Sequence, residues 1–400
     1  MKKILFVINT LGQAGAETAL LELFKRLKKE DCDIFLYVLM GQGEMFEQLP
    51  DWIKVLNSRF STLSVLTKEG RNRMAGTVLA AFKRNGNYLG KLSYTTGYLF
   101  SMMKKRRIQI DKLLWRMIAE GSVRFNETFD LAVAWLEGGS AYYVADYVNA
   151  SKKAAFIHID YEKAGYTKEM DRDCWRAYDG IFTISEGAKD HFLRFYPQYT
   201  PKTRVFYNLL DQETIRRRSL EPGGFADDFK GIRLLTVGRL TYQKGYDVAV
   251  EAMKLLKEKN FQVRWYVLGE GKLRGALERQ IEACDLKKDF VLLGAVENPY
   301  PYFREADVYV HATRYEGKSI ALQEAQVLGC AVIASDCSGN REQVADGRDG
   351  ILCELTPRAI AESIAALVEK GEMRKALGQA AKEKKQSQEQ AMMLLRELFA

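Results

Sequence analysis

Residues 311–350 read HATRYEGKSIALQEAQVLGCAVIASDCSGNREQVADGRDG. The pattern predicts a buried strand ending at His311, a polar turn that holds Glu316, and a helix that begins near Ser319 and carries Glu324. A second buried strand and a glycine-rich loop complete the stretch. Strands and helices that alternate in this way are the building units of an α/β domain.

The two glutamates flank the start of the predicted helix, since Glu316 precedes it and Glu324 lies inside it. The first N–H groups of a helix lack intrahelical partners, and the helix dipole favours an anion beside them. One carboxylate before the helix and one along its side suit a ligand with a phosphate in the middle and hydroxyl groups at both ends. A nucleotide sugar has this layout.

Short β-rich runs alternate with helical stretches along the rest of the chain, which is typical of parallel, doubly wound sheets. The expected strands cover residues 4–8, 34–39, 131–135, 154–158, 181–184, 205–207, 234–237, 264–268, 290–293, 308–311, 332–334 and 351–353. The periodicity breaks in 209–231, which contains Glu-Pro-Gly-Gly and Asp-Asp. We therefore expect two α/β domains, at 1–210 and 230–385, that face each other across a central cleft at the carboxyl ends of their strands.

Composition narrows the class of protein. Hydrophobic residues make up 47% of the 400 residues and charged residues 28%, as in soluble globular proteins. The six cysteines are scattered without a C-x-x-C pair, which predicts reduced thiols in a cytoplasmic protein and no zinc site. The apolar run 4–8 is too short for a signal peptide, and no apolar stretch approaches the ~18 residues that span a bilayer.

The segment from Glu316 to Glu324 resembles the signature of the retaining glycosyltransferases of family 4, which have the GT-B fold and are found in bacterial surface polysaccharide or lipopolysaccharide assembly. That signature is two glutamates separated by seven residues, as here. The resemblance assigns Glu324 to the ribose of the donor and places Glu316 beside the hexose. It also implies that the backbone N–H groups of Ser319, Ile320 and Ala321 contact the phosphates.

Two cations follow the predicted strand 234–237, in the segment Gly238-Arg239-Leu-Thr-Tyr-Gln-Lys244. Gly238 lets the backbone approach a phosphate, Arg239 can bind phosphate oxygens bidentately, and Lys244 supplies a point charge. In isolation such a loop is usually a solvated basic turn, but the family has Arg and Lys at these two places on the donor diphosphate. The resemblance also implies that the loop at Gly269 borders the nucleotide base.

The first domain offers fewer candidates. His158 ends a predicted strand, and the resemblance implies a role near the transferred sugar, whereas a structural role is the alternative. Glu137, in Trp-Leu-Glu-Gly-Gly, is a weaker candidate at another strand end. Gly15 opens the first helix and can present its N–H to the diphosphate or the acceptor.

Two positions depart from the family's pattern. The family usually has Gly-Gly-Ala-Glu where this chain has Ala14-Gly15-Ala16-Glu17, and a large apolar residue where this chain has Lys318. The resemblance further implies an acceptor-side first domain, a nucleotide-sugar-binding second domain, and a helix at 386–400 that packs back on the first.

These patterns predict a metal-independent, retaining hexosyltransferase. The expected donor is a nucleotide sugar, with a UDP-sugar preferred, and the expected acceptor is a saccharide or lipid-linked saccharide. Arg239, Lys244 and the helix N-terminus would stabilise the departing diphosphate, so neither a metal nor another cofactor is expected. A nucleotide-sugar epimerase-like enzyme, a dehydrogenase and a non-catalytic subunit of a glycosyltransferase pair are the alternatives. The missing G-x-G-x-x-G fingerprint counts against a dehydrogenase.

The residues from 68 to 124, within a predicted helical insert at about 60–125, carry thirteen Lys and Arg against three acidic residues. The rest of the chain has 47 basic and 49 acidic residues, so the net charge of +8 arises in this insert. Apolar and aromatic residues are interleaved with the cations, a composition that suits the surface of an anionic bilayer. We therefore expect a cytoplasmic protein, peripheral on the inner face of the membrane, that binds no nucleic acid. A solvated helical hairpin is the alternative.

Overall fold

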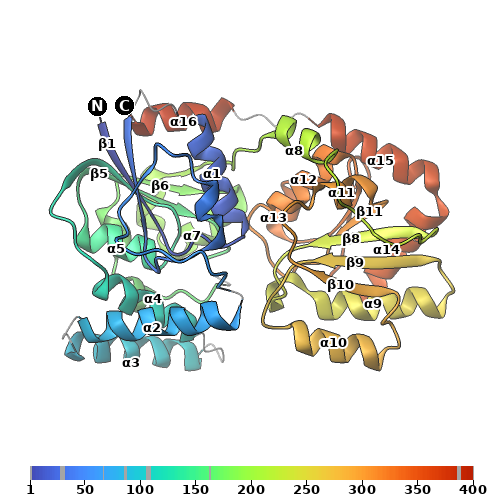
Figure 1. The fold of residues 1–400 in the computed structure, drawn as a ribbon, viewed down its shortest axis with the longest axis horizontal. Coiled ribbons are helices and arrows are strands. Elements are labelled where there is room, and N and C mark those ends of the chain that lie inside the picture. The colour runs from blue at the N-terminus through green and yellow to red at the C-terminus, as the bar shows by residue number, and fades with distance from the viewer. Residues whose placement is uncertain are drawn as a thin grey trace. The chain divides into compact units, whose positions relative to one another are not determined.

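The computed structural model describes residues 2–27, 32–65, 67–84, 88–104, 110–161, 164–384 and 389–399. The chain divides into two compact units, 1–209 with 388–400 and 210–387. Each unit contains one parallel β-sheet flanked by helices (Figure 1). Within the described residues, none of the helices combines the length and the apolar character that crossing a bilayer requires.

The first unit has a seven-stranded sheet in the order β3-β2-β1-β4-β5-β6-β7. Its strands are β1 (Lys2–Ile8), β2 (Cys32–Val38), β3 (Lys54–Val55), β4 (Thr128–Ala134), β5 (Asn149–Ile157), β6 (Gly180–Thr183) and β7 (Thr203–Val205). Its helices are α1 (Gly15–Arg26), η1 (Glu44–Gln48), α2 (Lys68–Arg84), α3 (Tyr88–Lys104), α4 (Ile110–Gly121), α5 (Gly139–Tyr147), α6 (Lys168–Asp171), η2 (Cys174–Ala177), α7 (Glu186–Phe195), η3 (Pro197–Lys202) and α16 (Glu389–Phe399).

The second unit has a six-stranded sheet in the order β10-β9-β8-β11-β12-β13. Its strands are β8 (Ile232–Val237), β9 (Val263–Leu268), β10 (Phe290–Gly294), β11 (Val308–His311), β12 (Ala331–Ser335) and β13 (Ile351–Cys353). Its helices are α8 (Gln212–Arg218), η4 (Tyr242–Lys244), α9 (Tyr246–Glu258), α10 (Arg274–Ala283), α11 (Tyr300–Glu305), α12 (Ile320–Leu328), α13 (Ser338–Arg341), α14 (Pro357–Glu369) and α15 (Gly371–Glu383).

The predicted strands are confirmed, because each of them overlaps a strand of the structure. The central strands carry nearly continuous apolar runs, and β11 and β12 are buried along their whole length. Such runs are expected of parallel strands whose two faces are both covered. The structure adds one strand that the sequence did not predict, the edge strand β3. It has two residues, one of them the exposed Lys54, so it lacks the continuous apolar run from which the other strands were predicted. All six cysteines are free, as predicted.

The strand order reverses between β8 and β11 in the second unit, and between β1 and β4 in the first. In open α/β sheets, ligands bind beyond the carboxyl ends of the strands at such a switch point. The segments after β8 and β11 carry Lys244 and Glu316, and the segments after β1 and β4 carry Gly15 and Glu137. Each sheet therefore brings predicted site residues to its own switch point.

Two segments outside the sheets complete the first unit. The basic insert forms α2, α3 and α4, with α4 packed on α2 and α5, and α3 packed on α6. Helix α16 belongs to the first unit, where Ala391, Leu394 and Leu395 are buried. The C-terminal end of α16 is hydrogen-bonded to β1, since Lys2 Nζ donates to the Phe399 carbonyl at 2.9 Å.

Candidate functional site

Two loops of the second unit meet at its switch point. The carbonyl of Gln243, in η4, accepts hydrogen bonds from Thr313 Oγ1 at 2.9 Å and from the Arg314 N–H at 2.8 Å. These bonds fasten η4 to the loop that follows β11. As a result Lys244, from the first loop, lies beside Glu316, from the second.

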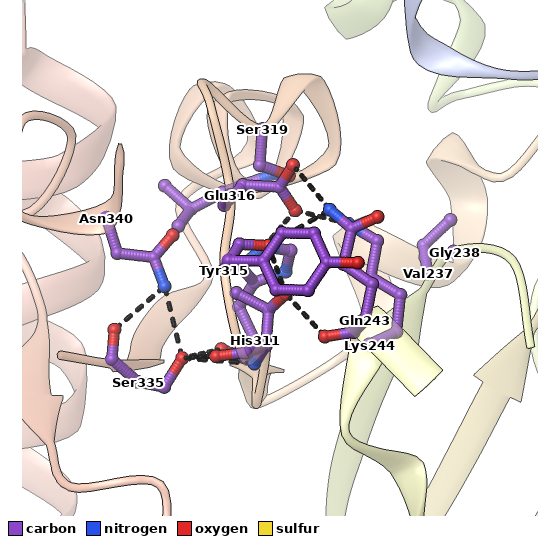
Figure 2. Close-up of polar contacts among 12 residues, drawn as sticks. Val237, Gly238, Gln243, Lys244, His311, Tyr315, Glu316, Ser319, Ser335 and Asn340 are labelled. Carbon is purple, nitrogen blue, oxygen red and sulfur yellow. Dashed lines mark hydrogen bonds and ion pairs between the residues drawn. The ribbon is translucent and has the colours of Figure 1, made fainter. Parts of the chain in front are cut away.

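The carboxylate of Glu316 is the centre of the site (Figure 2). Its Oε2 lies 2.5 Å from Lys244 Nζ and 3.3 Å from His311 Nε2. Its Oε1 accepts a bond from Gln243 Nε2 at 3.4 Å. The sequence predicted Glu316 and Lys244 as separate candidates, and the structure joins them in one ion pair with His311 and Gln243 around it.

The charges in this cluster follow from burial and from each other. Burial raises the pKa of Glu316, but the Lys244 ammonium and the hydrogen bond from His311 outweigh it and lower the pKa to about 2. Burial and the Lys244 charge lower the pKa of His311 against the opposing effect of Glu316, so the ring is neutral at physiological pH.

The hydrogen bonds also settle the tautomer of His311. An ionised carboxylate only accepts hydrogen bonds, so Nε2 of the neutral ring carries the proton that faces Glu316. Nδ1 is then an acceptor, and the hydroxyl of Tyr309 lies 3.3 Å from it. Tyr309, His311, Glu316 and Lys244 therefore form one connected chain from the core to the ion pair.

The loop that bears Glu316 is tied down on its far side as well. Ser335 Oγ, at the end of β12, accepts from the Thr313 N–H at 3.0 Å and donates to the Thr313 carbonyl at 2.5 Å. Gly339 packs against the backbone of this loop so closely that a Cβ at Gly339 would lie 1.9 Å from the Gly317 carbonyl oxygen. The turn is held in place before any ligand binds.

Helix α12 begins at Ile320, as the sequence predicted to within one residue, and Ser319 is its N-cap. Ser319 Oγ accepts from the Leu322 N–H at 3.3 Å. The N–H groups of Ile320 and Ala321 precede the first intrahelical bond and need a partner from outside the helix. This terminus follows Glu316 by a few residues and favours an anion.

Glu324 lies further along α12 and is buried, with 7% of its surface exposed. The Tyr300 hydroxyl, on α11, donates to its Oε1 at 3.1 Å. Burial is the main reason for the raised pKa of Tyr309, and the charges of Glu324 and Glu316 add to it, so both carboxylates lie near that hydroxyl. The two glutamates thus belong to one region of the second unit.

Two glycines shape the edge of the sheet beside this cluster. The N–H of Gly238 donates to the Leu268 carbonyl at 2.9 Å. Gly269 has φ +147, and a Cβ there would lie 2.0 Å from the Gly238 carbonyl oxygen, so only glycine fits. Arg239 follows with an exposed guanidinium that has no hydrogen-bond or ion-pair partner within the described part of the chain.

Lys318, the departure from the family's pattern, interacts with a different set of charges. Burial lowers its pKa to about 8, with Lys384 reinforcing the shift and Glu342 opposing it. Glu342 and Lys384 are therefore the charged groups that influence Lys318.

The first unit holds the three remaining candidates, His158, Glu137 and Gly15. The backbone N–H of His158 donates to Glu137 Oε2 at 3.0 Å, and its ring lies 5.2 Å from the Trp135 ring. Burial lowers the pKa of His158 to about 3, against a hydrogen bond to the Trp135 backbone. Its Nε2 is buried with no hydrogen-bond partner among the described residues, so it offers a lone pair. A neutral His158 can accept a hydrogen bond from a ligand but is too weak a base to hold a proton at neutral pH.

Gly15 is the first residue of α1 and is exposed. Its N-cap, Ala14, provides no side-chain cap, so the first N–H groups of the helix are left to other partners. The Thr10 hydroxyl donates to Glu17 Oε1 at 3.3 Å across the preceding turn. Gly15 therefore lies where the sequence predicted, at the helix start that follows β1.

Sequence reasoning missed His311, Gln243 and Tyr300 as members of the site. His311 carried a usable signal, because a polar side chain at the carboxyl end of a switch-point strand commonly faces the ligand site. Tyr300 carried none, since it reaches Glu324 from a helix 24 residues earlier in the chain.

The chain is similar to known glycosyltransferases. Residues 225–384 match the family model described as glycosyl transferases group 1. The chain is 30% identical over 206 residues to N-acetylgalactosamine-N,N'-diacetylbacillosaminyl-diphospho-undecaprenol 4-alpha-N-acetylgalactosaminyltransferase of Campylobacter jejuni, covering 51% of this chain and 54% of that enzyme. It is 32% identical over 145 residues to the amylovoran biosynthesis glycosyltransferase AmsK of Erwinia amylovora, covering 34% and 35%. The matches thus span about half or less of these relatives.

Solved structures resemble the whole chain. Staphylococcus aureus TarM, as a variant in complex with fondaparinux, alpha-GlcNAc-glycerol and UDP, aligns over 100% of both chains with a TM-score of 0.68 and 14% identity. Anabaena HepE in complex with UDP aligns over 95% of this chain and 93% of its own, with a TM-score of 0.64 and 15% identity. At such identities the likeness concerns the fold alone, and it confirms the GT-B prediction. Together with the family model, it supports a GT-B glycosyltransferase.

Proposed function

We propose that the protein is a retaining glycosyltransferase of family 4 that moves a hexose from a nucleotide sugar to a saccharide or lipid-linked saccharide in surface polysaccharide biosynthesis. The cluster of Lys244, Glu316 and His311 beside the N-terminus of α12 carries this proposal. It combines a cation, an anionic carboxylate and free helix N–H groups at a sheet's switch point. The UDP in the HepE and TarM complexes supports a UDP-sugar as the preferred donor.

The donor's diphosphate would bind between the loop after β8 and the start of α12. Lys244 has three N–H donors, and the bond to Glu316 uses one of them, so two are left for phosphate oxygens. The exposed Arg239 supplies a bidentate contact. The N–H groups of Ser319, Ile320 and Ala321 supply the remaining donors.

The two ends of the donor would meet the two glutamates. Glu324 accepts hydrogen bonds from the ribose hydroxyls, and Tyr300 orients its carboxylate from the other side. Glu316, held ionised by its partners, accepts a bond from a hydroxyl of the hexose. The close approach of Gly269 and Gly238 leaves the edge of the sheet open for the base and the phosphates.

The reaction breaks the bond between the anomeric carbon and the diphosphate oxygen, so negative charge grows on the diphosphate. Preorganised positive groups aimed at that oxygen lower the barrier, and Lys244, Arg239 and the α12 terminus fit this role without a metal ion. In the front-face route that we favour, the acceptor hydroxyl attacks from the side that the diphosphate leaves. Its proton passes to the leaving diphosphate, so no side chain needs to act as the base.

The test begins with donor binding. We expect UDP or GDP to raise the melting temperature of the purified protein and NAD to leave it unchanged. Incubation with a panel of UDP- and GDP-sugars, followed by mass spectrometry, then identifies the donor that the protein hydrolyses. Stabilisation by NAD and by no nucleoside diphosphate would refute the proposal.

Two further measurements address the finer points. Activity that persists with EDTA is expected for a metal-independent enzyme. NMR of the product should show the anomeric configuration of the donor, and an inverted linkage would contradict the retaining mechanism.

A further inference from the structure

One face of α3 presents a stripe of exposed apolar side chains. Leu92, Leu99, Phe100 and Met103 are 61%, 36%, 77% and 68% exposed. Positions 92, 99 and 103 are seven and four residues apart, so they share one side of the helix, and Phe100 lies next to them. Figure 1 shows α3 at the edge of the first unit, beyond α2 and α4.

The other side of α3 is anchored to the unit. Tyr98 is fully buried, and Lys91 Nζ donates to the Phe82 carbonyl on α2 at 2.7 Å. Gly97 packs against α6, where a Cβ would lie 3.4 Å from Glu169 Cβ. Because this side is fixed, the apolar stripe is held facing outward.

Exposed apolar side chains are concentrated in this part of the molecule. Thirteen large hydrophobic residues are exposed within the described ranges, and six of them lie on α2 and α3, which together have 34 residues. Leu79 and Phe82 are the two on α2. Exposed apolar side chains gathered in one part of a molecule mark an interaction site more often than isolated ones do.

The helix that Lys91 contacts, α2, carries positive charge. Five cations of α2 are exposed, and Glu69 is its single acidic residue; the cations are Lys68, Arg71, Arg73, Lys83 and Arg84. The cations at 105–107 lie outside the described residues and are not included in this surface.

Some cations of the insert serve the fold instead. Lys91 and Arg116 are buried, the latter 3.0 Å from Asp146, and Arg124 stacks 3.5 Å from the Tyr147 ring centroid. The charge available to a partner is therefore smaller than the thirteen cations of the sequence suggest, and it is concentrated on α2.

We propose that the α3 stripe and the α2 cations dock the first unit on an anionic lipid bilayer. Apolar side chains at headgroup depth, with cations beside them, are the arrangement by which helices lie on such a surface. A second copy of the chain would bring like charges together at the same surface. A nucleic acid would leave the aliphatic Leu92, Leu99 and Met103 without a role.

Vesicle sedimentation with the full-length chain tests the proposal, and it needs no sugar donor, so its result is independent of the proposed activity. We expect the protein to sediment with phosphatidylcholine vesicles that contain phosphatidylglycerol, and to be released as salt is added. Vesicles of phosphatidylcholine alone should bind it far less. Equal binding to both vesicle types, or binding to neither, would overturn the proposal.

Matched variants locate the surface. The double substitution Leu99→Ser with Phe100→Ser should weaken binding to the anionic vesicles by about tenfold, because it removes the inserted apolar groups. Leu220→Ser is the control, since Leu220 is 74% exposed in the second unit. Replacing Lys68 and Arg73 with Gln should weaken binding at low salt, with Lys287→Gln as the control for a lost exposed charge. Circular dichroism checks that each variant is folded.

Three results would overturn the proposal. One is wild-type affinity in the Leu99→Ser/Phe100→Ser variant. Another is a dimer in sedimentation velocity that this variant abolishes, which would assign the stripe to a second copy. The third is binding to single-stranded oligonucleotides at concentrations at which vesicles do not bind.

Discussion

Lys244 and Glu316 form an ion pair of 2.5 Å although 72 residues of sequence separate them. They come from the two loops that follow β8 and β11, the strands between which the sheet order reverses. His311 Nε2 forms a hydrogen bond with the same Glu316 carboxylate. The site's central charge is therefore fixed by the fold before a ligand arrives.

Replacing Lys244 with Ala should lower kcat by about 10²–10³, because the variant loses a cation that stabilises the departing diphosphate. Steady-state kinetics with the identified donor measures the change. Lys287→Ala, which removes an exposed lysine of the same unit, is the control and should leave kcat unchanged. An unchanged kcat in Lys244→Ala would remove Lys244 from the catalytic site.

His311 should act by positioning Glu316. His311→Leu removes the N–H that faces the carboxylate, so the pKa of Glu316 should rise and the acidic limb of the kcat profile should move to higher pH. His311→Gln can still donate a hydrogen bond and should recover part of the loss. Equal losses in both variants, with no movement of the acidic limb, would indicate a purely structural residue.

The pKa of Glu316 also predicts a dependence of stability on pH. Its pKa is lowered in the folded protein to about 2 from the usual 4.5, so the ionised carboxylate stabilises the fold above pH 4.5 by about 3 kcal/mol. That contribution is lost as the pH falls from about 5 towards 2. Urea unfolding between pH 6.5 and 3.5 should show a steeper loss of stability for the wild type than for Glu316→Gln. Parallel curves would contradict the assigned pKa.

Glu324→Ala should mainly weaken donor binding, because contacts with the ribose are alike in the ground and transition states. Titration calorimetry with UDP measures the affinity. Tyr300→Phe, which removes the bond to Glu324, should have a smaller effect in the same direction. Glu282→Ala, an exposed carboxylate of the same unit, is the control. Unaltered UDP affinity in Glu324→Ala would place the ribose elsewhere.

Gly269→Ala should destabilise the second unit and reduce donor binding. The new Cβ would lie 2.0 Å from the Gly238 carbonyl oxygen, at a φ of +147 that L residues rarely adopt. Gly275→Ala is the matched control, because its Cβ would meet nothing closer than 3.7 Å within α10. This control should be neutral or stabilising by up to about 1 kcal/mol. Thermal unfolding compares the two.

The sequence predicts the strands and the start of α12 well because these depend on local patterns. Continuous apolar runs predict β11 and β12, and Ser319 predicts the N-cap of α12. The roles of Glu316 and Lys244 were expected from the resemblance, but their pairing depends on two loops that only the folded sheet brings together.

Burial explains most of what the sequence did not reveal. For His158, burial lowers the pKa of the ring to about 3, so the ring is neutral at physiological pH. Part of the positive charge of the basic insert is neutralised within the first unit, since Arg116 forms an ion pair with Asp146. Composition counts such groups as surface charges, because it carries no information about which side of a helix faces the core.

The placement of α16 has a consequence for the way the protein is made. Residues 389–399 belong to the first unit, where Glu397 Oε2 lies 2.6 Å from Arg204 Nη1. During synthesis, however, residues 389–399 leave the ribosome after the whole of 210–387. Domains generally fold as units during synthesis, so the second unit can finish folding while the first still waits for its last helix. Until then the surface that receives Leu394 and Leu395 is uncovered, and a nascent chain stalled at this stage is the form in which we expect a chaperone to engage it.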